Sequence, residues 1–266
     1  MASSENLLKQ AENHLQKIFG FTAFRPGQRE ILEAVLDGKD ALVIMPTGGG
    51  KSLCFQLPAL IKPGITLVVS PLISLMKDQV DSLQMSGYPA TFINSSLPAN
   101  EQYARLEGMQ SGKYKLVYVA PERFASAQFM DRIRDMEISL LAVDEAHCIS
   151  QWGHDFRPSY TKLARVREQL GNVQTIALTA TATAYVQKDI IRQLRIPEHQ
   201  KFIAGFDRPN LHFSVDAIHD KLEGVLDFVH RNKGMGIIYA ATRNTSNRSL
   251  PHCAWRKFHP QPTMPD

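Results

Sequence analysis

Three glycines followed by a lysine and a serine form the stretch with the clearest chemistry. They are Gly48, Gly49 and Gly50, followed by Lys51 and Ser52. Glycine has no Cβ atom, so the backbone N–H groups of such a loop can surround a phosphate chain and point at it. The lysine supplies a positive charge. A serine hydroxyl at the start of a helix can bind the Mg²⁺ that accompanies nucleotide phosphates. The stretch predicts a phosphate-binding loop.

The residues before this loop narrow the class of nucleotide-binding protein. Met45 stands where the usual phosphate-loop pattern has glycine, and Thr47 directly precedes the glycines. This arrangement resembles the loops of helicase-like motor ATPases more than those of GTPases and small kinases. The alternative, a glycine turn with a chance lysine and serine, is disfavoured because the loop lies between an apolar strand at 41–45 and a helix.

Two carboxylates follow a strand of apolar residues at 140–143. Asp144 and Glu145 emerge where that strand ends, and buried carboxylates are costly unless a cation or a reacting group receives them. With a phosphate loop upstream, we expect Asp144 to bind Mg²⁺ and Glu145 to orient and activate the water that attacks the γ-phosphate. The alternative is a pair of acidic residues that merely ends a surface strand.

A glutamine upstream of the phosphate loop is a candidate for base recognition. The amide of Gln28 can donate and accept hydrogen bonds at once, which distinguishes adenine from guanine. Taken alone, a glutamine near the start of a helix is more often a solvated surface residue.

A segment without helical or strand periodicity contains interleaved aromatic and basic residues. Trp152, Phe156 and Tyr160 alternate with His154 and Arg157. Single-stranded nucleic acid binds to such surfaces, because bases stack on aromatic rings while guanidinium groups meet phosphates. The alternative is an aromatic cluster that packs the loop onto the core.

Another strand end presents hydroxyl groups instead of charges. The sequence from Thr179 to Thr183 reads Thr-Ala-Thr-Ala-Thr. Thr183 is a candidate helix cap. Considered together with the carboxylates, the segment is instead a candidate for coupling the nucleotide site to other parts of the protein.

The elements that position these residues alternate regularly between strand and helix. The apolar runs predict strands at 41–45, 66–70, 91–93, 115–120, 140–145 and 174–179. Helices are expected at 72–85, 100–110, 123–136, 160–170 and 183–194, after two N-terminal helices that end near Gly20 and Leu36. Continuously apolar strands separated by helices predict a three-layer α/β domain with a parallel sheet. In such sheets ligands bind at the carboxyl ends of the strands.

The motifs together resemble one helicase family. FRPGQ, MPTGGGKS, VVSPLISLMKDQV, YVAPER, AVDEAHCISQWGHDFRP, ALTATAT and FDRPNL occur in this order, and they are similar to those of the RecQ branch of superfamily-two DNA helicases. The resemblance runs from about residue 15 to 243. DEAH alone is shared with RNA helicases, whereas the SQWGHDFRP continuation points to RecQ. The resemblance implies a 3′→5′ DNA helicase of recombination and repair that is driven by ATP with Mg²⁺.

The resemblance also assigns roles to individual residues. It implies that Phe21 and Arg25 sandwich the adenine ring that Gln28 reads. It implies that His147 and His154 couple the nucleotide site to DNA. The residues expected to sense DNA are Trp152, Phe156 and Arg157, and residues in stretches similar to the family's strand-backbone contacts are Ser70, Lys77 and Asn94.

The last part of the chain departs from this family. A strand at 211–215, a helix at 221–232 and a strand at 236–241 resemble the start of a second motor domain, after which 244–266 lacks amphipathic periodicity. We expect N-terminal helices at 1–36, the first RecA-like domain at 37–207, an incomplete second one at 208–243, and an aberrant, disordered tail that results from a frameshift or truncation. Without the second domain's arginine, the chain should bind ATP weakly, hydrolyse it poorly and unwind no duplex.

Composition places the chain among globular proteins. Its 266 residues are 44% hydrophobic and carry a formal charge of +4, which is compatible with a polyanionic partner. The three cysteines have no paired spacing, so neither a disulfide framework nor a cysteine-rich zinc site is expected. There is no signal-peptide pattern. The prediction is a soluble monomer of the bacterial cytoplasm, associated with the nucleoid, that binds single-stranded and partially duplex DNA and no membrane. Two other hypotheses are a non-motor ATP- and DNA-binding module that competes with intact helicase, and a different P-loop ATPase.

Overall fold

A computed structural model describes residues 4–197, 200–204, 211–217, 219–232 and 234–239 of the chain. The chain divides into two compact units, Met1–Arg208 and Pro209–Asp266.

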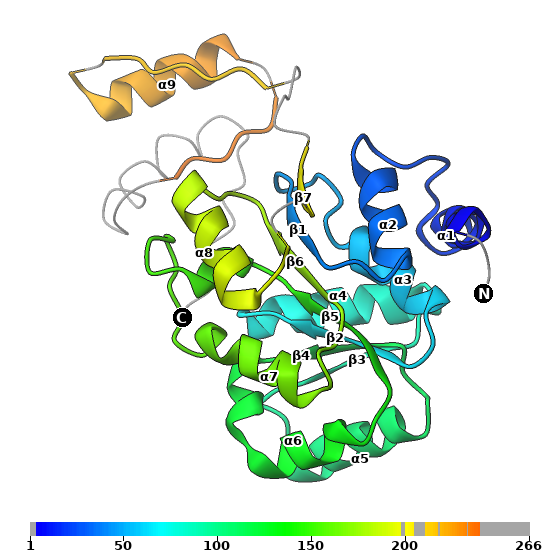
Figure 1. Cartoon of the computed structure of the whole chain (residues 1–266). Coiled ribbons are helices and arrows are strands. Elements are labelled where there is room, and N and C mark those ends of the chain that lie inside the picture. Colours follow the sequence, from blue (N-terminus) through cyan, green and yellow to red (C-terminus); the bar gives the residue numbers. More distant parts are fainter. Residues whose placement is uncertain (1–3, 198–199, 205–210, 218, 233, 240–266) are drawn as a thin grey trace. The chain divides into compact units, whose positions relative to one another are not determined.

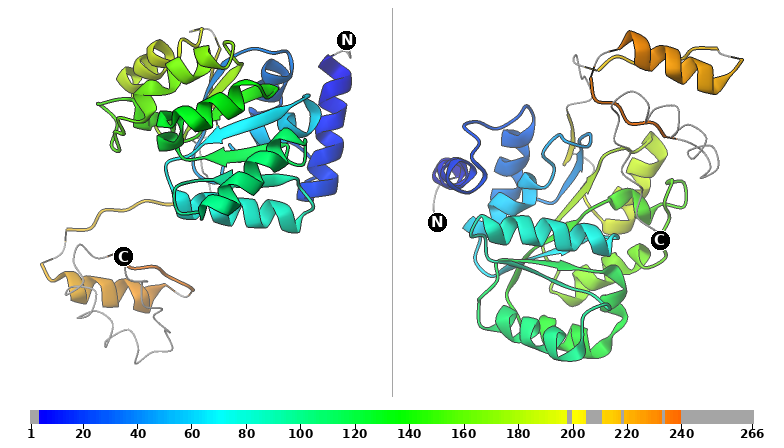
Figure 2. Two further views of the ribbon diagram at one scale, coloured as in Figure 1. Left: turned by 90° about the horizontal axis from the view of Figure 1, so that it is seen from below. Right: turned by 180° about the vertical axis from the view of Figure 1, so that it is seen from behind.

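The first unit is built on a seven-stranded sheet in which every pairing is parallel (Figure 1). The strand order is β3-β4-β2-β5-β6-β1-β7. The strands are β1 (Ala41–Ile44), β2 (Ile65–Val69), β3 (Ala90–Ile93), β4 (Leu116–Val119), β5 (Ile138–Val143), β6 (Thr175–Thr179) and β7 (Lys201–Ile203). Helices cover both faces of this sheet (Figure 2), so the predicted three-layer α/β fold is confirmed.

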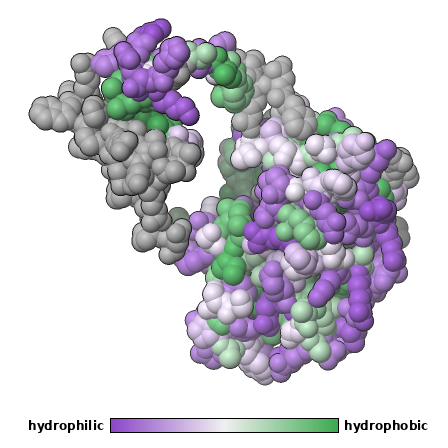
Figure 3. Space-filling view, turned by 90° about the vertical axis from the view of Figure 1, so that its left-hand side faces the viewer, coloured by the Kyte–Doolittle hydropathy of each residue, from purple (hydrophilic) through white to green (hydrophobic). Residues whose placement is uncertain are grey.

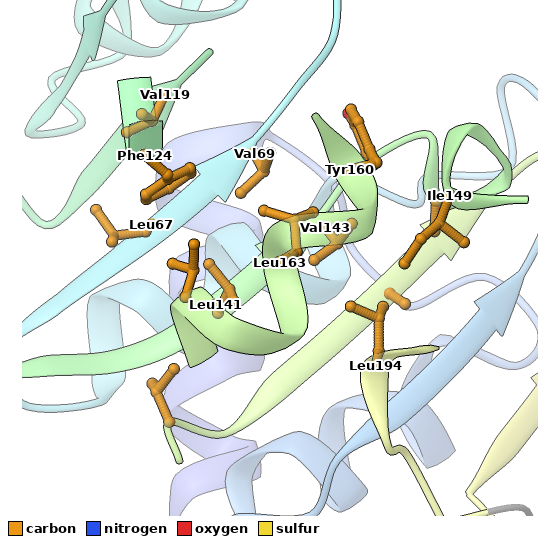
Figure 4. Close-up of a cluster of buried hydrophobic side chains, with 14 of the residues drawn as sticks. Leu67, Val69, Val119, Phe124, Leu141, Val143, Ile149, Tyr160, Leu163 and Leu194 are labelled. Atoms are coloured by element: carbon orange, nitrogen blue, oxygen red, sulfur yellow. The ribbon is translucent and has the colours of Figure 1, made fainter. Parts of the chain in front are cut away.

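One face of the sheet packs against the later helices. Alternate strand residues such as Leu67, Leu141 and Val143 form a buried cluster with Phe124 and Leu163 (Figure 4). The α-helices that contribute to it are α5 (Ala99–Gln110), α6 (Ala127–Arg134), α7 (Leu163–Gln169) and α8 (Ala184–Leu194). The period of two follows from the strand geometry, which turns successive side chains to opposite faces.

The other face packs against the earlier helices. Intervening strand residues such as Val43, Val68 and Ala142 form a second cluster with side chains of α2 (Gln28–Leu36), α3 (Leu53–Ile61) and α4 (Ile73–Met85). Helix α1 (Ser4–Phe19) packs on α2 and α3 through Leu8, Ala11 and Leu15. It ends at Phe19, and the next residue is Gly20, the predicted stop, whose φ of +72° is in the left-handed region.

Several predicted boundaries differ from the structure. The expected helices at 123–136 and 160–170 each begin with a 3₁₀ turn, η1 (Pro121–Ala125) and η3 (Tyr160–Lys162). Strand β5 ends at Val143, so the two carboxylates lie in the turn that follows, before η2 (Ala146–Ile149). The predicted elements also omit β7, a three-residue edge strand paired with β1, because it is too short to show a period.

The second unit contains the predicted helix, as α9 (Lys221–Arg231). The Asp220 side chain caps it by accepting hydrogen bonds from the backbone N–H groups of Leu222 and Glu223. The two strands predicted there are wrong for the residues that the structure describes: 211–217 and 234–239 contain no strand, and their backbone groups have no neighbouring strand to pair with among the described residues. The predicted tail at 244–266 lies outside the described residues.

Side chains on the surface of the first unit are mixed in polarity. On the face shown in Figure 3, hydrophilic residues surround smaller hydrophobic areas. None of the helices in the described ranges has the length and apolar character that crossing a bilayer requires.

Candidate nucleotide site and nucleic-acid loop

The glycine loop lies between the carboxyl end of β1 and the start of α3, as a phosphate site requires. Gly48 and Gly50 have φ angles of +77° and +86°, which side-chain-bearing residues rarely adopt. A Cβ atom on Gly50 would lie 2.4 Å from Nε2 of Gln28, and one on Gly49 would lie 2.9 Å from the carbonyl oxygen of Pro46. The loop conformation therefore requires glycine at more than one position.

Lys51 and Ser52 follow directly. The Lys51 ammonium donates to the carbonyl oxygens of Met45 at 3.0 Å and Pro46 at 3.3 Å. Ser52 is the residue before α3, and its hydroxyl makes no capping hydrogen bond. Both side chains line the same cavity as Gly48 and Gly50.

Gln28 connects the upstream segment to the glycine loop. It is 1% exposed, which excludes the surface alternative. Its Oε1 accepts from the backbone N–H of Arg25 at 2.8 Å, and its Nε2 donates to the carbonyl oxygen of Gly50 at 3.0 Å. The Arg25 guanidinium donates to the carbonyl oxygen of Gly48. The segment is thus held against the phosphate loop through two side chains.

A cavity of about 650 Å³ opens beside these residues. Its walls contain nearly all of the nucleotide-site residues predicted from the sequence: Phe21, Arg25, Gln28, Thr47, Gly48, Gly50, Lys51, Ser52, Asp144 and Glu145. Polar lining residues that the sequence reasoning missed are Gln56 of α3 and Asp78, Gln79 and Ser82 of α4. The only sequence signal for the α4 residues is their spacing, which puts them on one face of a predicted helix.

Asp144 and Glu145 have different environments. Asp144 is 8% exposed, and burial, with a smaller contribution from the charge of Glu145, raises its pKa to about 6. Its Oδ1 accepts from the backbone N–H of Glu145 at 2.9 Å. Glu145 has a φ of +46°, and a hydrogen bond from His147 lowers the pKa of its carboxyl group. The pair therefore contains one buried carboxyl group that a bound cation would stabilise in its ionised form, Asp144, and one carboxylate that is already favoured in its ionised form, Glu145.

His147 lies between the carboxylates and two other segments. Its Nδ1 is 3.2 Å from Oε2 of Glu145 and 3.0 Å from Oγ1 of Thr179. Its ring stacks on the ring of His154, with centroids 4.1 Å apart and an angle of 19° between the planes. Three contacts of this imidazole thus join the end of β5, the end of β6 and the aromatic-rich loop, the segment that contains Trp152, His154, Phe156 and Arg157.

The aromatic side chains of that loop have separate roles. Tyr160 is buried, and its hydroxyl donates to the carbonyl oxygen of Asp144 at 3.0 Å, so the packing alternative holds for this residue. Trp152 is 79% exposed, so it does not hold the loop on the core. Phe156 is half-buried. Arg157 donates to the carbonyl oxygen of Pro71 at 2.9 Å and pairs with Asp155.

Other candidate residues are more dispersed. Thr183 caps α8, with Oγ1 accepting from the backbone N–H of Val186 at 3.4 Å, whereas Thr179 contacts His147. The helix-cap interpretation is therefore confirmed for Thr183, and coupling through Thr179 stays a prediction. Ser70 and Asn94 are buried at the ends of β2 and β3, and Lys77 is exposed and paired with Asp81 at 3.0 Å.

The donor set at the cavity fits Mg²⁺ held together with phosphates. A carboxylate from Asp144 and a hydroxyl from Ser52 are oxygen ligands of the kind that Mg²⁺ prefers, and this ion usually takes one or two carboxylates and completes its shell with phosphates and water. The described residues contain no group of three or more His, Cys, Asp or Glu side chains arranged to hold a metal.

Comparison with known sequences places these residues in a wider family. A family model described as DEAD/DEAH box helicase matches residues 25–190. The protein named ATP-dependent DNA helicase RecQ from Haemophilus influenzae is 47% identical over 235 residues, which are 88% of this chain and 38% of the relative. The Bacillus subtilis protein of the same name is 46% identical over 245 residues, 91% of this chain and 42% of the relative. The chain spans about two fifths of the length of these curated relatives.

Solved structures share the fold at lower identity. The helicase MrfA superposes with a TM-score of 0.70 at 18% identity, covering 96% of this chain and 41% of that one. A hypothetical ATP-dependent RNA helicase from Sulfolobus tokodaii gives a TM-score of 0.59 at 20% identity, covering 93% of this chain and 72% of that one. At these identities the likeness shows the fold.

Proposed function

Because the chain belongs to the DEAD/DEAH box helicase family, with RecQ helicases among its relatives, we propose that it carries the first motor domain of an ATP-dependent DNA helicase of RecQ type. ATP with Mg²⁺ supplies the phosphoanhydride bond whose cleavage powers such a motor. The chain's own residues bind the nucleotide, orient a water and couple hydrolysis to the aromatic-rich loop, where DNA would bind.

The roles follow from the positions of the side chains. Lys51 neutralises phosphate charge, while Ser52 and Asp144 hold the metal. Glu145, ionised beside His147, accepts the proton of the attacking water. Gln28 and Arg25 line the cavity and are the candidates for reading the base, and Phe21 is 46% exposed and available for stacking.

The observation that carries this proposal is that His147 contacts both the Glu145 carboxylate of the nucleotide site and the aromatic-rich loop. Its Nδ1 lies 3.2 Å from the Glu145 carboxylate, and its ring lies on the ring of His154, which belongs to the loop that exposes Trp152. A change in the hydrogen bonding of Glu145 during the nucleotide cycle therefore reaches the loop through one side chain. We infer that occupancy of the cavity and DNA binding at the loop are coupled there.

A linkage experiment tests the coupling. The affinity of the chain for a fluorescent ATP analogue is measured with and without an oligo-dT strand, in the wild type and in His147→Ala. We expect the strand to change the nucleotide affinity of the wild type about 5- to 100-fold, a usual range for allosteric coupling. The variant should keep both separate affinities near their wild-type values and lose most of the coupling.

Two further variants make the outcomes distinct. Trp152→Ala should weaken binding of the oligo-dT strand and leave nucleotide binding intact. Tyr103 is an exposed aromatic residue on α5, and Tyr103→Ala should change neither affinity. If His147→Ala retained full coupling, the proposed path through the imidazole would be wrong. If the wild type bound no strand, the DNA-binding role itself would fail.

The polarity and the cellular role are also part of the proposal. We expect translocation 3′→5′, acting in recombination and repair at the bacterial nucleoid, as the resemblance of the sequence motifs implies. Duplexes with a 3′ tail or a 5′ tail, given to the helicase that contains this domain, test the polarity: preferential unwinding of the 5′-tailed duplex would reverse it.

A second candidate function is a module that binds ATP and DNA without acting as a motor. Among the described residues, the cations that line the cavity are Arg25 and Lys51, and both belong to the nucleotide-binding segments. An arginine that stabilises the transferring phosphate increases rates by about 10³ to 10⁵. We therefore expect the 266-residue chain to bind ATP weakly and hydrolyse it slowly, and to compete with intact helicase for DNA. A DNA-stimulated turnover equal to that of the intact relatives would exclude this alternative.

A further inference from the structure

The exposed face of α8 carries an aromatic and two basic side chains that have no role in the proposed nucleotide chemistry. Tyr185, Lys188 and Arg192 are exposed or half-exposed, and their spacing of i, i+3 and i+7 puts them on one side of the helix. Tyr185 is 78% exposed, nearly as much as Trp152. We call these three residues the α8 stripe.

The α8 stripe is adjacent to the aromatic-rich loop. The Ser150 hydroxyl donates to the Asp189 carboxylate of α8 at 2.7 Å and accepts from the backbone N–H of Trp152 at 3.2 Å. Gln193 also donates to the carbonyl oxygen of Ile149 at 3.0 Å. Asp189 follows Tyr185 by one helical turn, so these two hydrogen bonds fix the start of the loop to α8 beside the stripe.

We propose that the α8 stripe extends the loop into a binding track for single-stranded DNA, in which bases stack on Trp152 and Tyr185 while Lys188 and Arg192 meet phosphates. The proposal rests on the proposed function, because the loop is the other half of the track. An exposed tyrosine flanked by two cations has the aromatic and positive character that single strands bind.

Length and charge agree with this occupant. Seven residues of helix span about 10 Å at 1.5 Å per residue, which is at most about three nucleotides, because about 3.4 Å is the rise per nucleotide in duplex DNA and a bound single strand is more extended. The acidic group on this side, Asp189, is 15% exposed and pairs with Arg192 at 2.6 Å and with Ser150. The carboxylate is therefore already satisfied by the protein, and the Arg192 side chain is still 76% exposed.

Fluorescence anisotropy of labelled oligo-dT against the 266-residue chain tests the track. We expect Tyr185→Ala to raise the Kd about 5- to 100-fold, the usual effect of removing the ring on which one base stacks. Tyr185→Phe should restore most of the affinity, since stacking needs the ring and not the hydroxyl. Nucleotide affinity should be unchanged in both variants, which controls for folding.

The charges are tested through salt dependence. The double variant Lys188→Gln with Arg192→Gln should reduce the slope of log Kd against log salt by about 1.4, or about 0.7 for each phosphate that the protein no longer neutralises. Lys9→Gln with Lys17→Gln on α1 removes the same charge from another helix and should leave the slope nearly unchanged. A labelled oligo-U strand of equal length shows whether RNA binds there equally well, and tighter binding of RNA than of DNA would overturn the assignment of DNA as the occupant.

The outcomes separate this inference from the proposed function. If Trp152→Ala weakened binding and both stripe variants did not, the loop would stand and the track would be refuted. If no variant changed the affinity of a strand that binds, both would be refuted. If the α1 and α8 charge variants reduced the salt slope equally, the reduction would be a general effect of positive charge. The proposed track would then be refuted.

Discussion

In the first unit, charged side chains at the two ends of the strands have opposite environments. We call the side of the sheet where the strands begin the amino edge and the side where they end the carboxyl edge. At the amino ends of the strands, Asp40 accepts from the backbone N–H of Thr175 at 2.8 Å and pairs with Arg167. Arg167 also donates to the carbonyl oxygens of Val173 at 3.1 Å and Leu194 at 2.7 Å. At the carboxyl ends, Asp144 is 8% exposed and accepts from the backbone N–H of Glu145 at 2.9 Å, but its carboxylate forms no ion pair within the described residues.

This difference separates charges that stabilise the fold from charges kept for a ligand. A buried carboxylate is tolerated where the chain itself supplies the opposite charge and the hydrogen bonds. Where it does not, folding carries the cost, and binding of a cation recovers it. The amino edge is therefore structural, and the carboxyl edge is the place where nucleotide and metal are expected.

The largest expected effect is at the amino edge. Arg167→Met leaves the Asp40 carboxylate, whose side chain is 13% exposed, without its charged partner, which should lower the free energy of unfolding by about 3 to 5 kcal/mol. Urea unfolding followed by circular dichroism measures this loss. Nucleotide affinity, measured where the variant is folded, should not change.

The control removes both charges together. Arg167→Met combined with Asp40→Asn should recover more than half of the lost stability, because no uncompensated charge remains. If the single and double variants were equally unstable, the loss would come from packing and the comparison of the two edges would lose its electrostatic basis.

The next effect is at the carboxyl edge and has the opposite character. Lys51→Ala should weaken binding of an ATP analogue about 10- to 100-fold, since a charge-assisted hydrogen bond contributes about 1.5 to 3 kcal/mol. The half-buried ammonium donates to loop carbonyls, so the unfolding midpoint should shift little. Isothermal titration together with thermal melting measures both quantities. A large loss of stability with unchanged affinity would make Lys51 a structural residue.

The same substitution should have opposite signs at the two edges. The folded-state pKa of Asp144 is raised to about 6, above the unfolded value of about 3.9, so its contribution to stability is lost as the pH rises from about 4 through 6. In metal-free buffer at pH 7.5, Asp144→Asn should therefore stabilise the chain by about 1 to 2 kcal/mol. Asp40→Asn should destabilise it.

The pH profile provides the check on this prediction. The advantage of Asp144→Asn should disappear below about pH 4, where the wild-type carboxyl is protonated in both states. An advantage that persisted unchanged at about pH 3.5 would arise from something other than ionisation, and a destabilised variant at pH 7.5 would show that Asp144 has a partner in the folded chain.

The sequence predicts the carboxyl edge far better than the amino edge. Gly48 to Ser52 and Asp144-Glu145 are short motifs whose chemistry depends on neighbouring residues, so local sequence is sufficient to place them. Asp40 and Arg167 are 127 positions apart, and nothing in their local sequence indicates a pair. The strands of the sheet were predicted from continuous apolar runs, and β7 was not, because three residues with two exposed side chains carry no such signal.

The environment of a predicted residue is also beyond local sequence. Gln28 has the chemistry to read a base, yet its burial and its hydrogen bond to the carbonyl oxygen of Gly50 depend on a close approach of segments 22 positions apart. The contact of His147 with Thr179 similarly requires β5 and β6 to be neighbours. Strand order is a tertiary property, so sequence reasoning could suggest coupling without locating it.

The smallest expected effect divides the carboxyl edge itself. Thr183→Ala removes the hydroxyl that accepts from the backbone N–H of Val186, which should lower the free energy of unfolding by about 1 kcal/mol, the usual cost of losing a helix cap. Nucleotide affinity should not change, and Thr183→Ser should keep the cap and the stability. Thr179→Val preserves β6 but removes the oxygen next to His147. It should therefore reduce the coupling between binding of the DNA strand and binding of the nucleotide. If Thr183→Ala reduced that coupling as much as Thr179→Val, the division between a structural and a functional hydroxyl would be wrong.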